Sequence, residues 1–196
     1  MRWHWSAGTS KRWPLTGIQT SGWETDIASV AGGRAAVQVA IATFGSVDVV
    51  VNNAGFAFGG GDLREPNQSE LEALMAVHFL AAVGTMSAAN TDMQKRSWGR
   101  IINTVSEVAL DTRIHGSIGY AAAEAALWSA TINAAQVGAE HGITVNAISP
   151  GARTRMNAKL LDKVARSAPT DDPAAGRQTR WGNRTRCRAR CITSTS

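Results

Sequence analysis

The sequence predicts an α/β domain in which a parallel sheet carries helices on both of its faces. Three short apolar segments have the β-branched content of buried strands: VDVVV at 47–51, RIINTV at 100–105 and ITVNAIS at 143–149. Helix-compatible segments separate them, and strands that alternate with helices form βαβ units with right-handed crossovers. At 196 residues the chain is long enough for one such domain.

Small and apolar residues favour a helix over residues 28–44, although Gly32 and Gly33 each cost it about 1 kcal/mol relative to alanine. Ser69, followed three residues later by Glu72, has the pattern of a capping box. We therefore expect a long helix that begins there and runs to about residue 95.

The segment from Tyr120 to about Glu140 is rich in alanine and lacks proline, which strongly favours a helix. Gly142 is expected to end it. A further helix is expected over residues 154–166. Helices thus follow each of the three predicted strands.

Composition divides the chain into three parts. Residues 1–25 hold four of the seven tryptophans but show neither helical nor strand periodicity, so we expect an irregular segment. The core is expected to span 26–166. Residues 167–196 form a basic tail without apolar periodicity, which is typical of a disordered segment.

The net charge of +5 belongs to the tail, because residues 177–196 carry six arginines and no acidic residue. A solvated arm is favoured over a nucleic-acid contact. Cys187 and Cys191 lie in the same segment, and a single CxxxC pair is weak evidence for a metal, so no metal site is predicted. No signal-like or membrane-spanning pattern stands out, and we expect a cytoplasmic protein without a membrane contact.

Several motifs follow one another in order along the core. NNAG at 52–55 comes directly after the first predicted strand, Ser106 follows the second, and YAAAE begins at Tyr120. ITVNAISPG ends at Gly151. This ordered set resembles the short-chain dehydrogenase/reductase family, whose members bind a nicotinamide dinucleotide on a Rossmann-type fold.

The resemblance runs from about residue 26 to residue 156 and implies NAD or NADP as the cofactor. It also implies which positions line the adenine and nicotinamide ends of that cofactor. These are Asp26, Asn53, Ala54, Gly55, Pro150, Gly151 and Thr154.

Hydride transfer to or from a carbinol carbon requires a proton to move at the attached oxygen, and a phenol can exchange it. The resemblance assigns this role to Tyr120, and it makes Ser106 the hydroxyl that holds the substrate oxygen. The implied substrate is a small alcohol or carbonyl compound. The nearest resemblance is to the 3-oxoacyl reductase and hydroxyacyl-CoA dehydrogenase branch.

Glu124 stands where the family has a lysine that lowers the pKa of the tyrosine and binds the nicotinamide ribose. At about 6 Å and an effective dielectric near 20, a unit charge contributes roughly 3 kcal/mol. An ionised Glu124 would raise the pKa of Tyr120, where a lysine would lower it. Tyr120 is therefore predicted to stay a protonated phenol, able to donate its proton but reluctant to act as a base.

His78 stands where the family commonly has an asparagine whose backbone carbonyl anchors a water of the proton relay. The substitution keeps that carbonyl. Two interpretations stay open, a histidine satisfied by its packing and one that relays protons itself.

The family's first strand and its TGxxxGxG turn have no counterpart in the sequence. LTGIQTSG at 15–22 has its second glycine off the spacing, and Pro14 interrupts the strand that should precede it. The predicted sheet is therefore incomplete, without its first strands and its last one. Residues 47–51 then become a sheet edge, which favours association.

Two classes of function follow. The first is an NAD(P)-dependent oxidoreductase, with Ser106, Tyr120, Glu124 and His78 at the catalytic positions. The second is a catalytically impaired remnant that acts through subunit or partner binding. For either class, a homo-oligomer formed through the two long helices is expected.

Overall fold

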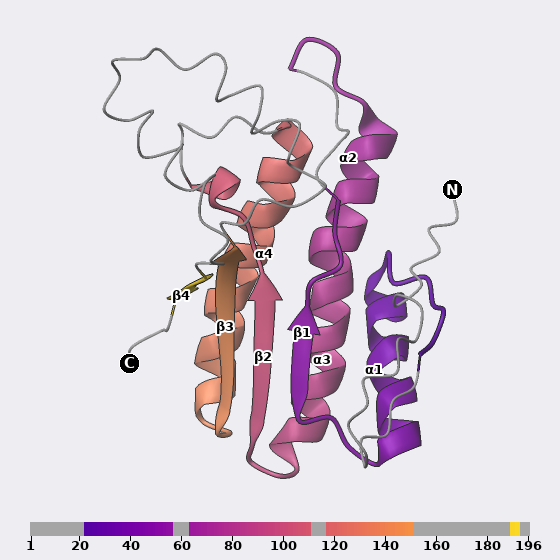
Figure 1. Ribbon diagram of the computed structural model, residues 1–196, viewed down its shortest axis with the longest axis vertical. Coiled ribbons are helices and arrows are strands. Elements are labelled where there is room, and N and C mark those ends of the chain that lie inside the picture. Colours follow the sequence, from indigo (N-terminus) through magenta and orange to yellow (C-terminus); the bar gives the residue numbers. More distant parts are fainter. Residues whose placement is uncertain (1–21, 57–62, 111–116, 151–188, 193–196) are drawn as a thin grey trace, which may run out of the picture.

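The computed structural model describes residues 22–56, 63–110, 117–150 and 189–192. Within these ranges the strands form one sheet in the order β1-β2-β3-β4 (Figure 1). The strands β1 (Val49–Asn52), β2 (Gly99–Thr104) and β3 (Ile143–Pro150) are parallel. The three strands predicted from the sequence are thereby confirmed, and their carboxyl ends meet at one edge of the sheet.

The fourth strand, β4 (Ala189–Ile192), pairs antiparallel with β3, so that Arg190 lies opposite Ser149. The prediction that the whole tail is disordered is wrong for these four residues. Strand pairing uses backbone N–H and C=O groups, and the free edge of β3 offers them to a segment that has no apolar pattern of its own. The predicted helix at 154–166 lies outside the described residues.

Helix α1 (Val30–Phe44) begins at its N-cap Ser29, whose side chain accepts a hydrogen bond from the Gly32 N–H. It ends at Gly45, which has the left-handed conformation, with φ of 87°. Helix α4 (Ile118–Ala139) is capped by the Ser117 side chain. Both helices were predicted to within two residues.

The long helix consists of α2 (Gln68–Met75), a π-helical turn η1 (Ala76–Leu80) and α3 (Ala81–Gln94). Its N-cap is Asn67, whose Oδ1 accepts hydrogen bonds from the Glu70 N–H at 3.2 Å and the Ser69 hydroxyl at 2.9 Å. The predicted capping box at Ser69 is therefore wrong. Asn67 has the extended backbone that a cap requires, and Ser69 lies within the first turn.

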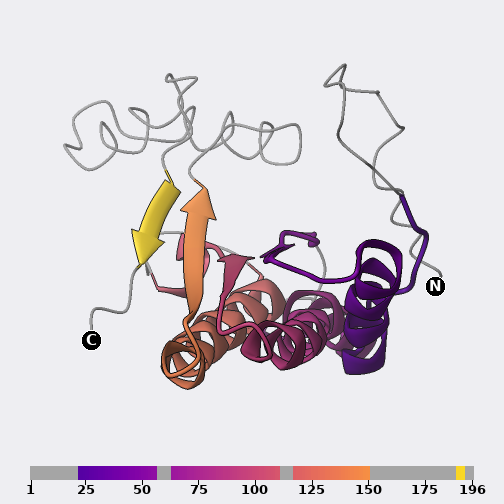
Figure 2. The ribbon, with the colours of Figure 1, turned by 90° about the horizontal axis from the view of Figure 1, so that it is seen from below.

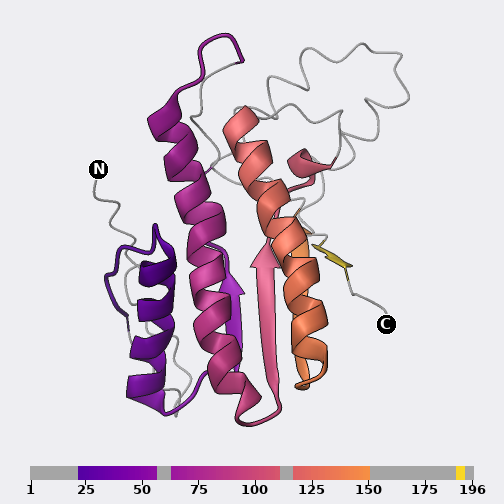
Figure 3. The same ribbon diagram turned by 180° about the vertical axis from the view of Figure 1, so that it is seen from behind.

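All the described helices cover the same face of the sheet (Figure 2), and Figure 3 shows α1, α3 and α4 side by side in front of it. The expectation of helices on both faces is not met by the described elements. The strands β1, β2 and β3 advance across the sheet in one direction, and right-handed crossovers then place every connecting helix on one side. Helices on the other side require a reversal of the strand order.

The core lies between this face and the helices. Val50, Ile101 and Val145 from the three parallel strands pack with Met86 and Met93 from α3. On the opposite face Val49 and Val51 are 51% and 56% exposed. The strand β1 therefore has one buried and one open face, and in the described part of the sheet it is also the edge strand.

The helix Gln68–Gln94 is long and apolar enough to cross a membrane, judged by length and composition alone. Several of its residues, among them Leu74, Ala89 and Met93, are fully buried within the domain. We therefore interpret it as the core helix of an α/β fold.

Candidate functional site

The predicted catalytic residues gather at the carboxyl edge of the parallel strands, where open α/β sheets bind ligands. Ser106 follows β2 in an extended conformation and caps the short 3₁₀ helix η2 (Glu107–Ala109), its hydroxyl accepting from the Val108 N–H at 3.3 Å. Tyr120 lies in the first turn of α4, where its N–H donates to the Ser117 hydroxyl at 3.2 Å. The ends of two separate elements thus present the two side chains.

The fold brings Ser106 and Tyr120 together, close enough for the Ser106 hydroxyl to influence the ionisation of the phenol. Burial raises the pKa of the Tyr120 phenol, the charge of Glu124 raises it further, and the hydrogen bond with Ser106 lowers it in part. The pKa of Tyr120 is raised overall, as the sequence predicts. Burial is nevertheless the larger cause, ahead of the Glu124 charge on which the sequence prediction rests.

Glu124 does not point out into the site as the family's lysine position implied. Its Oε1 lies 2.7 Å from Nδ1 of His78, and the two residues are only 2% and 7% exposed. The other carboxylate oxygen, Oε2, is buried without a hydrogen-bond partner among the described residues. The two residues that depart from the family pattern, His78 and Glu124, therefore form one buried pair.

His78 lies in the π-helical turn η1, and its ring packs edge-on against Tyr120 with centroids 5.3 Å apart. Its second nitrogen, Nε2, is 3.0 Å from the Phe56 nitrogen and 2.8 Å from the Phe56 oxygen. A neutral ring protonated at Nδ1 would accept from the N–H there, and an imidazolium would donate to the carbonyl. Nε2 of His78 therefore has a hydrogen-bond partner on the Phe56 backbone in either charge state of the ring.

The predicted cofactor-binding turn lies directly after β1. The Asn53 side chain accepts a hydrogen bond from the Thr104 hydroxyl at 3.0 Å, which ties the ends of β1 and β2. Asn53 and Gly55 are exposed, and Ala54 is half-buried. A Cβ at Gly55 would overlap the imidazole of His78, so this position requires glycine.

The remaining predicted cofactor residues are only partly covered by the structure. Pro150 is the exposed last residue of β3, at the same edge as Ser106. Asp26 precedes α1, and its carboxylate accepts from the Ala28 N–H at 3.0 Å. Gly151 and Thr154 lie outside the described residues. Cofactor contacts at these four positions stay predictions.

A buried polar network behind the site was not predicted. The Asn103 side chain, fully buried in the middle of the sheet, accepts from the Asn52 amide at 2.7 Å and donates to the Thr131 hydroxyl at 2.8 Å. The Thr85 hydroxyl donates to Asn52 at 2.7 Å. The network joins β1 and β2 to α3 and α4. The asparagine within the apolar run RIINTV was the signal that could have revealed it.

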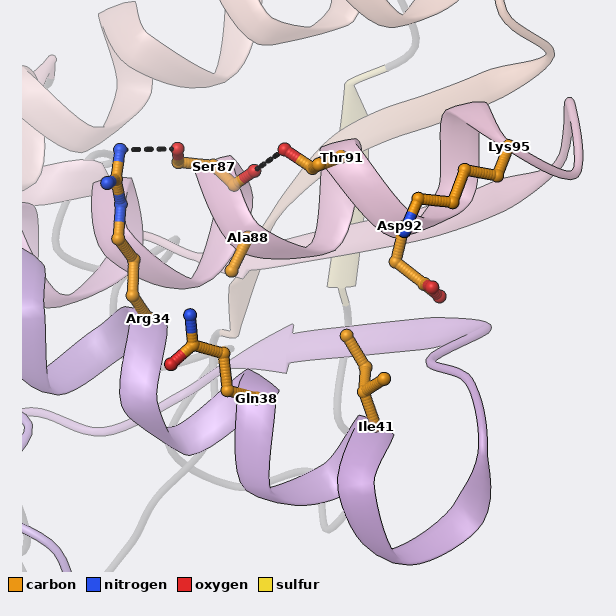
Figure 4. Close-up of a pocket in the computed structure, with 8 residues that line it drawn as sticks. All are labelled: Arg34, Gln38, Ile41, Ser87, Ala88, Thr91, Asp92 and Lys95. Atoms are coloured by element: carbon orange, nitrogen blue, oxygen red, sulfur yellow. Dashed lines mark hydrogen bonds between the residues drawn. The ribbon is translucent and has the colours of Figure 1, made fainter.

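A pocket of about 290 Å³ opens between α1 and α3, away from these residues (Figure 4). Two of its lining charges have partners, since Arg34 donates to the Ser87 hydroxyl and the Asp92 carboxylate accepts from Arg96 and the Val47 N–H. It contains no predicted site residue. In the part of the chain that the structure describes, no three His, Cys, Asp or Glu residues lie close enough together to hold a metal.

The charge of Glu124 can be tested at Tyr120, because it is the only tyrosine in the chain. Its ionisation can therefore be followed by the ultraviolet absorbance of tyrosinate. We expect Glu124→Gln to lower the pKa of Tyr120 by removing the nearby negative charge, and Ser106→Ala to raise it by removing a hydrogen bond. Glu140→Gln, at the exposed end of α4, is the control. An unchanged pKa in Glu124→Gln would show that Glu124 carries no charge felt by the phenol.

Fold and site together define the class of protein. A parallel sheet with one-directional βαβ crossovers, and a Ser–Tyr pair at its carboxyl edge, is the arrangement expected of a Rossmann-like oxidoreductase domain. Residues 9–165 match the model of the short chain dehydrogenase family. The chain belongs to that family. The match begins ahead of residue 26, where the family-like core was predicted to start.

Known relatives agree with this assignment. The diacetyl reductase [(S)-acetoin forming] of Staphylococcus epidermidis is 33% identical over 161 residues, which are 81% of this chain and 62% of that protein. A metagenomic short-chain oxidoreductase in complex with NADP is 27% identical, with a TM-score of 0.63 over 69% of this chain and 61% of that one. NAD⁺-bound xylitol dehydrogenase, at 23% identity and a TM-score of 0.65 over 80% of this chain and 62% of that one, shares the fold.

The chain spans less than two thirds of the length of the curated relatives it matches, from 14% to 62%.

Proposed function

We propose that this chain is an NAD(P)-dependent oxidoreductase that interconverts a small alcohol and the corresponding carbonyl compound. The observation that carries the proposal is the meeting of Ser106 and Tyr120 at the carboxyl edge of the sheet, where the Ser106 hydroxyl partly offsets the rise in the pKa of the phenol. A phenol held by a hydroxyl at this edge is placed to exchange a proton with a substrate oxygen. The similarity to a diacetyl reductase supports a carbonyl substrate.

The residues present fit the nicotinamide end of a dinucleotide in part. The turn at Asn53–Gly55 is tied to the end of β2 by the Thr104–Asn53 hydrogen bond, and its Gly55 lies against the His78 ring that packs on Tyr120. With Asn53 and Gly55 exposed, it offers backbone to a ligand. Glu124, at the position implied to bind the ribose, is buried against His78 and reaches no ligand. We therefore assign the cofactor contact to the turn and to the edge of β3 at Pro150. The similarity to an NADP complex supports the cofactor class.

When bound, the cofactor would supply or accept the hydride, and the protein's own residues manage the proton. The raised pKa of Tyr120 keeps its phenol protonated at neutral pH. In the reductive direction the phenol donates that proton to the carbonyl oxygen as the carbon receives the hydride, and the Ser106 hydroxyl holds the oxygen. The oxidative direction needs a tyrosinate, which burial and Glu124 both disfavour. We therefore propose reduction as the favoured direction, with 3-oxoacyl compounds as one substrate class.

The second candidate, an impaired family member that acts through subunit or partner binding, is favoured by one observation. The residue at the lysine position is an acid that raises the pKa of Tyr120. Exposed apolar side chains on α4, among them Ile132 and Val137, support the proposed homo-oligomer. A cytoplasmic location and a sheet truncated relative to the family remain proposals as well.

Cofactor binding separates the two candidates. We expect the full chain to bind NADPH or NADH with a submillimolar Kd, measured by the change in nicotinamide fluorescence on titration. Tyr120→Phe serves as the matched control, because it removes the proton donor and leaves the turn at 53–55 unchanged. If neither nucleotide binds at millimolar concentration, the oxidoreductase proposal is wrong, and the result supports the partner-binding candidate.

A further inference from the structure

We infer that His78 and Glu124 form one positioning unit, which holds the turn at 53–56 against the helix that carries Tyr120. A lysine at position 124 is therefore accommodated only when the imidazole at position 78 is removed. The inference rests on the proposed function for its cofactor-binding readout. Together, His78 and Glu124 contact the turn and the tyrosine rather than the reacting atoms.

The first support is connectivity. The imidazole of His78 bonds Glu124 on α4 through Nδ1 and the Phe56 backbone through Nε2. The same ring lies against Gly55 and packs on the Tyr120 ring. One side chain therefore joins the turn after β1, the long helix and the helix of the catalytic tyrosine. Displacing His78 would loosen the turn and the tyrosine together.

The second support is the local backbone. His78 lies in a π-helical turn, where the Ala81 N–H bonds the Ala76 carbonyl five residues back. Single π turns inside α-helices are rare and occur frequently at functional sites. The turn places His78 among the buried residues of the long helix, facing α4. The helix thus adopts an irregular geometry at the residue that makes these contacts.

The third support is charge and burial. Glu124 is almost fully buried, its Oε1 is paired with His78, and its Oε2 has no partner among the described residues. Removing one partner of a buried pair of ionisable side chains leaves the other buried without compensation. A lysine at position 124 alone would place an ammonium against the imidazole and would lose the one hydrogen bond that the side chain makes within the described part of the chain. A change of Glu124 is therefore coupled to the identity of residue 78.

This coupling predicts the behaviour of four forms of the full chain: the natural protein, His78→Asn, Glu124→Lys and the double variant. We expect each single variant to raise the Kd for NADPH at least tenfold, about 1.4 kcal/mol. The double variant is expected to recover to within about threefold of the natural protein, because asparagine removes the imidazole that a lysine would meet. Glu140→Lys, with the same charge change at an exposed site, should leave the Kd unchanged.

A double variant whose Kd is raised by the product of the two single effects would overturn the inference, and so would a Glu124→Lys variant that binds as well as the natural protein. The midpoints of urea unfolding provide a readout independent of cofactor. Both single variants should lower the midpoint, and the double variant should regain most of the loss. If the natural chain binds no NADPH, the proposed function fails, and these midpoints alone decide: recovery supports the unit, and additive losses overturn it.

Discussion

Tyr120→Phe is expected to lower the turnover number for carbonyl reduction by about 10²- to 10⁴-fold, the usual contribution of a positioned proton donor. The substitution keeps the ring that packs against His78 and removes only the phenolic hydroxyl. Without this hydroxyl, the developing alkoxide has no proton source of the required geometry. The loss should appear in kcat, while the Kd for NADPH stays within about threefold.

The measurement is NADPH oxidation with diacetyl as the probe substrate, together with a nucleotide titration of each variant. Thr91→Val is the matched control, because it removes a hydroxyl from the exposed face of α3, where it donates to the Ser87 carbonyl of the same helix. Since the pKa of Tyr120 is raised, the natural enzyme should keep its reductive rate above neutral pH and lose it as pH approaches that pKa. Full activity in Tyr120→Phe would show that the proton comes from another group.

Gly84→Ala is expected to lower the free energy of unfolding by about 3 kcal/mol, the upper part of the range for overpacking. A Cβ on Gly84 in α3 would overlap the Val30 carbonyl of α1, and a Cβ on Gly33 in α1 would overlap the Ala81 carbonyl. The two helices therefore contact each other through a glycine on each side. Backbone atoms cannot move aside as a flexible side chain can, so α1 would have to shift as a whole.

Urea unfolding of Gly84→Ala and Gly33→Ala, followed by circular dichroism, measures the effect. Gly22→Ala is the control, because a Cβ there meets nothing within 4 Å. Equal midpoints for Gly84→Ala and the control would contradict a close contact of α1 with α3. Because both glycines lie away from Ser106 and Tyr120, any loss of activity should follow the loss of folded protein.

Local sequence determined most of the secondary structure. The three β-branched runs became β1, β2 and β3, and the small-residue and alanine-rich segments became α1 and α4, because strand and helix preferences act over a few neighbouring residues. The order of the motifs likewise indicated the family and the meeting of Ser106 with Tyr120. Asn67 was missed as a cap because Ser69 and Glu72 offered the same pattern two residues later.

Tertiary structure decided the rest. The direction of the crossovers placed all the described helices on one face, and backbone pairing with β3 recruited a strand from an unpatterned tail. The sequence showed His78 and Glu124 as two separate departures from the family. Only the packing of α4 on η1 made them one buried pair, since charges far apart in the chain interact according to distance and burial in space.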